Sequence, residues 1–100
     1  MRLRSFQSLS PLGIGCEALG GYNWGQVNIE TIQSAILTKL ERATGNVLLD
    51  TADTYGPNLS EVRLGNLING RSEKAFVATK FGVRLDESNH AYYDNRPVYI

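Results

Sequence analysis

Residues 47–56 read Val47-Leu48-Leu49-Asp50-Thr51-Ala52-Asp53-Thr54-Tyr55-Gly56, an apolar run that gives way at once to polar and turn-forming residues. The apolar part does not alternate with polar residues, which is typical of a strand buried on both faces. A second run of this kind is Ala75-Phe76-Val77-Ala78, and it is followed by Thr79-Lys80-Phe81-Gly82. The sequence therefore predicts two buried strands, each of which ends in residues able to carry chemistry.

The spacing of apolar residues predicts one helix before the first of these strands and another between the two. The first helix has apolar residues three, four and four positions apart, on one face: Ile29, Ile32, Ile36 and Leu40. We expect Asn28 to cap the start of this helix and Gly45 to cap its end. The second helix is predicted to begin after an N-cap at Ser60 and to stop at Asn69-Gly70.

Outside these elements, the first fifteen residues are predicted to form short strands, and Arg84 to Pro97 a long irregular loop. Buried strands that alternate with helices imply βαβ units in a parallel sheet. A doubly wound sheet and a (β/α)8 barrel both begin in this way. The phosphate-binding signature that would favour the doubly wound sheet is missing, because the Gly13-x-Gly15 pair lacks a third glycine.

Asp50, Tyr55 and Lys80 follow the carboxyl ends of the two predicted strands, where function gathers in parallel α/β folds. If the strands are neighbours, Asp50 and Lys80 lie about 5 Å apart, within reach of Tyr55. An ammonium beside a tyrosine favours the phenolate, and a carboxylate keeps that ammonium charged. The tyrosine can then protonate a carbonyl oxygen while a cofactor supplies hydride, which no side chain can. Taken singly, each residue is more often a turn former, a solvated lysine or a packing tyrosine.

Several segments together resemble the aldo-keto reductases, in that family's order and spacing over nearly the whole chain. These segments are Asp50-Thr51-Ala52-Asp53-Thr54-Tyr55-Gly56, Ser60-Glu61, Leu64-Gly65, Ala78-Thr79-Lys80-Phe81-Gly82, and Leu12-Gly13-Ile14-Gly15 leading into a Gly-Gly-aromatic loop. The resemblance implies an α/β fold, the N-terminal part of a (β/α)8 barrel whose floor is closed by a hairpin at Leu3 to Leu9. It also implies reduction of an aldehyde or ketone with NADPH or NADH, or the reverse oxidation of an alcohol or sugar.

The family's catalytic tetrad of Asp, Tyr, Lys and His maps in part onto this sequence. Asp50, Tyr55 and Lys80 correspond to three members, and the histidine belongs at the end of a fourth strand. Units of about 30 residues place that strand end beyond Ile100. His90, the one histidine present, is therefore expected to be a surface residue of the loop after the third strand.

The resemblance also implies binding residues. It places Gly15, Cys16 and Glu17 near the cofactor, together with Asp50. A threonine is common in relatives where Cys16 stands. Tyr22 and Trp24 are candidates for the wall of the substrate pocket, or else for packing on the barrel rim.

Composition narrows the classes of partner. Ten acidic and ten basic residues cancel, and neither sign forms a block, which argues against nucleic acid or an anionic membrane as the main partner. No signal peptide or apolar stretch of about 20 residues is evident. The lone Cys16 excludes a disulfide framework and a multi-cysteine metal site. We expect a cytoplasmic protein with a small carbonyl, alcohol or sugar substrate.

An alternative from another class stays open: a regulatory partner protein on the same barrel that binds the cofactor without turnover, like the potassium-channel β-subunits. Residues 1–100 are expected to be the N-terminal segment of one barrel domain that is incomplete at its C-terminus. A chain of these residues alone would lack the tetrad histidine and most cofactor contacts, so we expect it to be inactive. The substrate, the choice between NADPH and NADH, and the oligomeric state are left undetermined by the sequence.

Overall fold

A three-stranded parallel sheet forms the centre of the chain, in a computed structural model that describes residues 8–21 and 23–100. Its strands are β1 (Ile14–Gly15), β2 (Val47–Asp50) and β3 (Ala75–Ala78), in the order β1-β2-β3. The register pairs Gly15 with Asp50 and Asp50 with Ala78, so all three strands end at the same edge. The predicted parallel neighbours are confirmed. Most of the hairpin expected at Leu3 to Leu9 lies outside the described residues.

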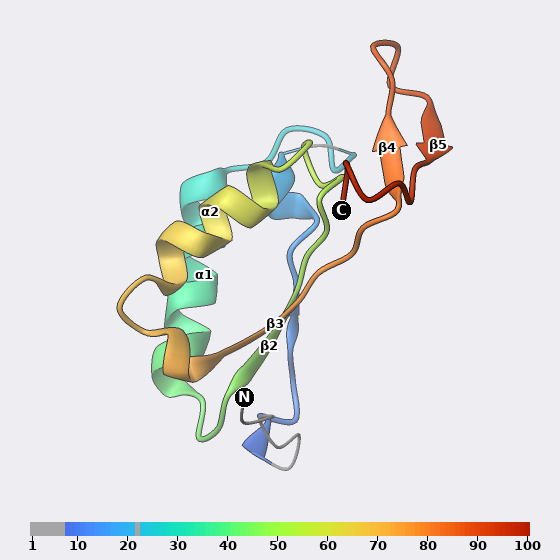
Figure 1. The fold of residues 1–100 in the computed structure, drawn as a ribbon. Coiled ribbons are helices and arrows are strands. Elements are labelled where there is room, and N and C mark those ends of the chain that lie inside the picture. Colours follow the sequence, from blue (N-terminus) through green and yellow to red (C-terminus); the bar gives the residue numbers. More distant parts are fainter. Residues whose placement is uncertain (1–7, 22) are drawn as a thin grey trace.

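Two helices, α1 (Ile29–Arg42) and α2 (Leu59–Ile68), lie on the same side of this sheet (Figure 1). Short 3₁₀ turns, η2 (Ala18–Gly20) and η3 (Ser72–Lys74), precede α1 and β3. The predicted cap is confirmed, because Asn28 Oδ1 accepts the amide of Thr31 at 3.0 Å. The predicted C-cap at Gly45 is wrong, because the backbone is already extended at Ala43. None of the described helices is long and apolar enough to cross a membrane.

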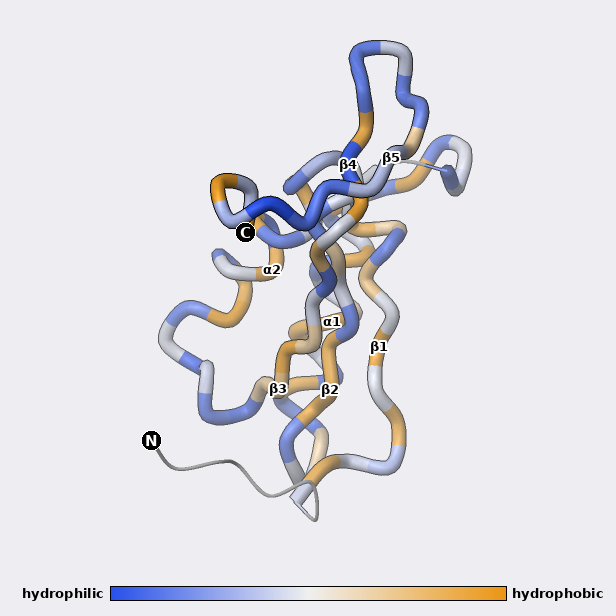
Figure 2. The backbone as a smooth tube through the Cα atoms, turned by 45° about the vertical axis from the view of Figure 1, so that its right-hand side comes forward, coloured by the Kyte–Doolittle hydropathy of each residue, from blue (hydrophilic) through white to orange (hydrophobic). Residues whose placement is uncertain are grey.

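The core lies between the sheet and the two helices. Its fully buried members come from both layers: Cys16, Leu19, Ile36, Leu40, Val47, Leu49, Leu64 and Ala75. Along β2 the burial alternates, since Val47 and Leu49 face the helices while Leu48 is only half-buried. Burial of each large aliphatic side chain contributes about 1.5–3 kcal/mol, so this layer accounts for much of the packing energy. In Figure 2 the colour that marks hydrophobic residues is concentrated along β2 and β3.

The prediction that both strands are buried on two faces is wrong for the described residues. Phe76 is half-buried, and Val77 is 41% exposed. Val77 lines a shallow hollow of about 130 Å³ with Leu64 and Ile68 of α2. The α2 helix borders this hollow without covering Val77, so the apolar side chains of β3 are only partly buried by the described residues.

The segment predicted as a long loop instead forms an antiparallel hairpin of β4 (Val83–Leu85) and β5 (Ala91–Tyr93). Its turn is held by Asp86, whose Oδ1 accepts the amides of Ser88 and His90 at 2.8 Å each. Asn89 adopts a positive φ of 62°, which asparagine tolerates. The prediction missed this hairpin because each strand is only three residues long and the turn depends on contacts between the Asp86 side chain and the backbone. In Figure 1 the hairpin projects beyond the carboxyl ends of the sheet.

Asp94 anchors the base of the hairpin. It is 4% exposed and accepts from Arg96 Nε at 2.8 Å and Arg96 Nη2 at 2.8 Å, a bidentate pair. Arg84 Nη1 approaches the same carboxylate at 3.3 Å. The hydrogen bonds from Arg96 lower the pKa of Asp94 well below its usual range. Beyond this cluster the chain returns to the sheet, where the Tyr99 hydroxyl donates to the carboxylate of Asp53.

We predict that Asp94→Asn loosens the hairpin, because an amide cannot accept both arginines as a carboxylate does. Amide exchange in residues 83–93 should accelerate on the order of tenfold. Because the folded pKa is depressed, the carboxylate's contribution is complete above about pH 4 and is lost as the pH falls. The wild-type hairpin should therefore loosen only in acid, and the variant at neutral pH. Asp86→Asn, which keeps an acceptor, is the matched control; equal exchange in both variants would contradict the anchoring role.

Candidate active site

The side chain of Lys80 brings together the three residues singled out from the sequence. Its Nζ donates to Asp50 Oδ1 at 2.7 Å, to the Thr51 carbonyl oxygen at 2.9 Å and to Tyr55 Oη at 3.4 Å. These contacts use all three N–H donors of the ammonium. The same nitrogen lies 5.1 Å from the centre of the Tyr55 ring. Asp50, Tyr55 and Lys80 therefore form one cluster at the carboxyl edge of the sheet.

The electrostatics of the cluster keep the lysine charged. The hydrogen bond to Asp50 is the main cause that raises the pKa of Lys80 above its ordinary value, and the bond to Tyr55 adds to it. The side chains of Lys80 and Asp50 are 51% and 46% exposed, so the ion pair is worth at most about 1 kcal/mol of stability. Lys80 is thus half exposed although it is paired on two sides. This geometry favours a role in the chemistry of the site over a role in holding the fold.

Two glycines let the loop that carries Tyr55 pack directly on the end of η2. A Cβ added to Gly56 would lie 2.0 Å from the carbonyl oxygen of Gly20, and Gly56 has a φ of +64°. A Cβ added to Gly20 would in turn lie 2.6 Å from the carbonyl carbon of Tyr55. Only glycine permits this backbone-on-backbone approach. The position of Tyr55 over Lys80 thus depends on the contact between Gly20 and Gly56.

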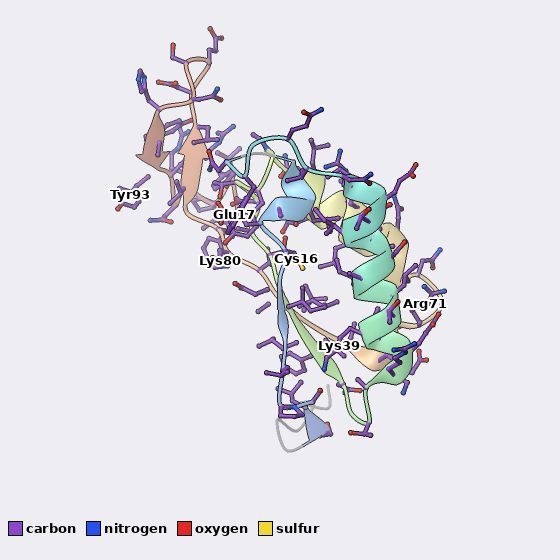
Figure 3. The ribbon with its side chains drawn as sticks, turned by 180° about the vertical axis from the view of Figure 1, so that it is seen from behind. Cys16, Glu17, Lys39, Arg71, Lys80 and Tyr93 are labelled. Carbon is purple, nitrogen blue, oxygen red and sulfur yellow. The ribbon has the colours of Figure 1, made fainter. Side chains whose placement is uncertain are left out.

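A hollow of about 340 Å³ opens beside the cluster, lined by residues that the sequence had pointed to and one neighbour: Gly15, Cys16, Glu17, Ala18, Trp24, Asp50 and Tyr55. A Cβ added to Gly15 would meet no atom within 4 Å, so the floor at this position is open. Glu17 also borders a second hollow of about 330 Å³ under the β4–β5 hairpin. Figure 3 shows Cys16, Glu17 and Lys80 around this end of the molecule and Lys39 and Arg71 away from it.

The remaining candidates are placed differently. Trp24 lines the first hollow but is 60% exposed, and Tyr22 lies outside the described residues. The side chain of His90 is 82% exposed on the hairpin turn and pairs with Asp86, which confirms its expected place on a surface loop. Within the described ranges, no three His, Cys, Asp or Glu residues gather closely enough to hold a metal ion.

The thiol of Cys16 faces the core instead of the hollow. The residue is 1% exposed and belongs to the core cluster, and its Sγ donates to the Ile14 carbonyl at 3.7 Å. Burial, and next the charge of Asp50, raise the pKa of Cys16 to about 11. The thiol is therefore not presented to the hollow, and the amide and carbonyl of Cys16 are already hydrogen-bonded to Asp50 and Ser60.

We predict that Cys16 resists alkylation in the native protein. A pKa of about 11 leaves roughly 0.1% of the thiol ionised at pH 8, and burial restricts access further. Labelling with iodoacetamide, followed by mass spectrometry of the peptide, should be on the order of 100-fold slower than in the denatured chain. Rapid labelling under native conditions would show that the thiol reaches solvent.

Sequence reasoning missed the position of Ser60. It was predicted as an N-cap, but α2 begins at Leu59 and Ser60 lies inside the helix, 0% exposed. Its Oγ donates to the Cys16 carbonyl at 2.8 Å and lies 2.8 Å from Thr51 Oγ1. One signal was available, since Ser60 shares the helical face of Leu64 and Leu67 at spacings of four and seven. A serine on an apolar face is expected to be buried and to need partners.

Comparison with known proteins gives a consistent result. Residues 11–98 match the family model described as "Aldo/keto reductase family". The chain is 34% identical over 90 residues to the aldo-keto reductase YhdN of Bacillus subtilis, covering 84% of this chain and 25% of that protein. It is 33% identical over 97 residues to "Probable aldo-keto reductase 1" of Glycine max, covering 92% and 26%. The chain thus spans about a quarter of the length of these relatives.

A solved structure matches the fold as well. The glycerol dehydrogenase of Gluconobacter oxydans superposes with a TM-score of 0.61 at 32% sequence identity, covering 87% of this chain and 27% of that one. The predicted fold class is confirmed: the chain has the α/β architecture of the N-terminal part of a (β/α)8 barrel. In such barrels the carboxyl edge of the strands carries the active site, and the cluster around Lys80 lies at this edge.

Proposed function

The chain belongs to the aldo-keto reductase family, and we propose that the protein carrying it reduces an aldehyde or ketone with NADPH or NADH, or oxidises the corresponding alcohol or sugar. The observation that carries this proposal is the arrangement of Lys80, whose ammonium donates to Asp50, Thr51 and Tyr55 at once. The proposal treats residues 1–100 as the first segment of one barrel domain, in which a histidine from outside the described cluster completes the tetrad.

Tyr55 is the proposed general acid. Its hydroxyl proton passes to the carbonyl oxygen of the substrate as the carbonyl carbon gains hydride, so the C=O group becomes an alcohol. The phenolate left on Tyr55 accepts a hydrogen bond from Lys80 Nζ, which lies 3.4 Å away and stays charged beside Asp50. Asp50 and the Thr51 carbonyl occupy the other two donors, which aims the third at Tyr55. In the reverse direction the same phenolate is the base that removes the alcohol proton.

The cofactor residues are also part of the proposal. Gly15, Glu17 and Asp50 border the hollow beside Tyr55, and the backbone of Cys16 joins them. The open space above Gly15 is compatible with a flat ring, because no side chain projects from this position. A bound nicotinamide would supply the hydride. Trp24 lines the first hollow and the β4–β5 hairpin lines the second, and both suit walls of a pocket for a small substrate.

The test is turnover by the natural gene product that carries this chain. We expect it to consume NADPH or NADH, followed by the absorbance of the reduced nicotinamide, only when a small aldehyde or ketone is added. The alcohol product should appear in equal amount. Tight cofactor binding without turnover of a panel of aldehydes, ketones and sugars would contradict the enzyme proposal and favour the regulatory partner protein. Absence of cofactor binding would contradict both.

A further inference from the structure

Ser60 lies where three parts of the site meet, although its side chain reaches none of the proposed reacting groups. Ser60 is 0% exposed, and Thr51 and Cys16 beside it are each 1% exposed. The hydroxyl of Ser60 donates to the Cys16 carbonyl, and a serine hydroxyl has a single proton. Thr51 must therefore be the donor in its 2.8 Å contact with Ser60. The result is a buried chain of two hydrogen bonds, called the relay below, in which Thr51 donates to Ser60 and Ser60 donates to the Cys16 carbonyl.

Each of the three residues of this relay is linked to one member of the cluster. The amide of Ser60 donates to the Tyr55 carbonyl at 3.1 Å. The carbonyl of Thr51 accepts from Lys80 Nζ at 2.9 Å. The amide of Cys16 donates to the Asp50 carbonyl at 2.8 Å. Ser60 is thus hydrogen-bonded to Cys16, Thr51 and Tyr55, and each of these residues is next to a cluster member in sequence, bonded to one, or a member itself.

We propose that Ser60 is a positioning residue, whose buried relay sets the distances among Asp50, Tyr55 and Lys80. The contact between Lys80 Nζ and Tyr55 Oη is 3.4 Å, at the outer limit of a hydrogen bond, so a shift of a few tenths of an ångström would break it. Buried hydroxyls resist such shifts because an unpaired partner cannot turn to water. The effect on turnover rests on the proposed function, whereas the effect on geometry does not.

The primary test is Ser60→Ala in the natural gene product. The change leaves the Thr51 hydroxyl without its acceptor and removes one of the two hydrogen bonds to the Cys16 carbonyl, which keeps the amide of Leu19 at 3.2 Å. We therefore expect kcat to fall about tenfold or more. The cofactor Kd should stay within about twofold, because the hollow keeps its own lining. Amide exchange at residues 58–60 should accelerate on the order of tenfold. Ser10→Ala is the matched control, because it also removes a serine hydroxyl. The hydroxyl of Ser10 accepts from Lys39 Nζ at 3.2 Å, and this pair is not part of the cluster.

If Ser60→Ala fails to fold, two substitutions at Thr51 test whether the hydroxyl relay positions the cluster. Thr51→Val keeps the shape and removes the hydroxyl, whereas Thr51→Ser keeps the hydroxyl and removes a methyl group. The relay predicts lower kcat and faster exchange at residues 58–60 for Thr51→Val, and values near wild type for Thr51→Ser. Equal losses in the two variants would overturn the proposal, because packing and not the hydroxyl would then matter.

The geometric readout separates this inference from the proposed function. If the wild-type protein turns over no carbonyl substrate, the reductase proposal fails, and amide exchange alone then tests Ser60. Faster exchange in Ser60→Ala than in Ser10→Ala supports the positioning role. Exchange and kcat in Ser60→Ala that match wild type overturn it, as does a loss of kcat without any change in exchange.

Discussion

Tyr55→Phe should lower kcat/KM for a small aldehyde by roughly 10²–10⁴-fold, the usual contribution of a general acid. The substitution removes one oxygen from a half-buried side chain and leaves the ring that packs beside Lys80. Without the hydroxyl, the third N–H of Lys80 is the described donor left near that place, and its ammonium is a poor acid because the hydrogen bond to Asp50 raises the pKa of Lys80. Steady-state turnover and cofactor titration of the natural gene product make the measurement.

The loss should be confined to the chemical step. The cofactor Kd of Tyr55→Phe is expected to stay within about twofold of wild type, because the remaining lining of the hollow is unchanged. Tyr93→Phe is the matched control: it removes the same oxygen from a tyrosine that is 86% exposed on β5, and activity should not change. Full turnover by Tyr55→Phe would rule out the proposed mechanism even if the family assignment stands.

Gly56→Ala is predicted to be the most destabilising substitution in the site. The left-handed φ of +64° disfavours any side chain by about 1–2 kcal/mol. The added Cβ would also overlap the Gly20 carbonyl at 2.0 Å, and backbone cannot rotate away as a side chain can. Together we expect a loss of about 3 kcal/mol or more in the free energy of unfolding. Turnover should fall too, because Tyr55 is the neighbouring residue and must move.

Gly65→Ala is the control for this prediction. Gly65 lies inside α2, and a Cβ added there meets no atom within 4 Å. Alanine favours the helix over glycine by about 1 kcal/mol, so Gly65→Ala should be neutral or stabilising. Denaturant unfolding of both variants measures the difference. A Gly56→Ala protein as stable as wild type would show that the loop carrying Tyr55 is free to shift away from η2.

Much of the site was predictable because its residues obey local rules. Asp50 directly follows one apolar run and Lys80 lies two residues after the other, and parallel strands end at a common edge, so their proximity follows from two short segments. The helix from Ile29 was predictable for a similar reason, through its apolar spacing and the cap at Asn28. In each case the signal lies within a few residues of the feature it predicts.

The missed features depend on partners that lie far apart in the sequence or on polar turns. The β4–β5 hairpin has little hydrophobic alternation, and its turn is set by the Asp86 side chain. The apolar residues of β3 predict where the strand begins and ends. They do not predict that Val77 is 41% exposed, because its burial depends on which helices pack over the strand. The resemblance places Cys16 near the cofactor, but the structure shows that the side chain of Cys16 packs in the core.

By itself, the sequence determined the parallel order of strands and helices, the resemblance to the family and the meeting of Asp50 and Lys80 at one edge. Only the tertiary structure decided how Tyr55 is held over Lys80, through the contact of Gly20 with Gly56 and the buried hydroxyl of Ser60. The physical reason is separation along the chain. Ser60 bonds to a carbonyl 44 positions away, and a contact of that range leaves no periodic pattern in either segment.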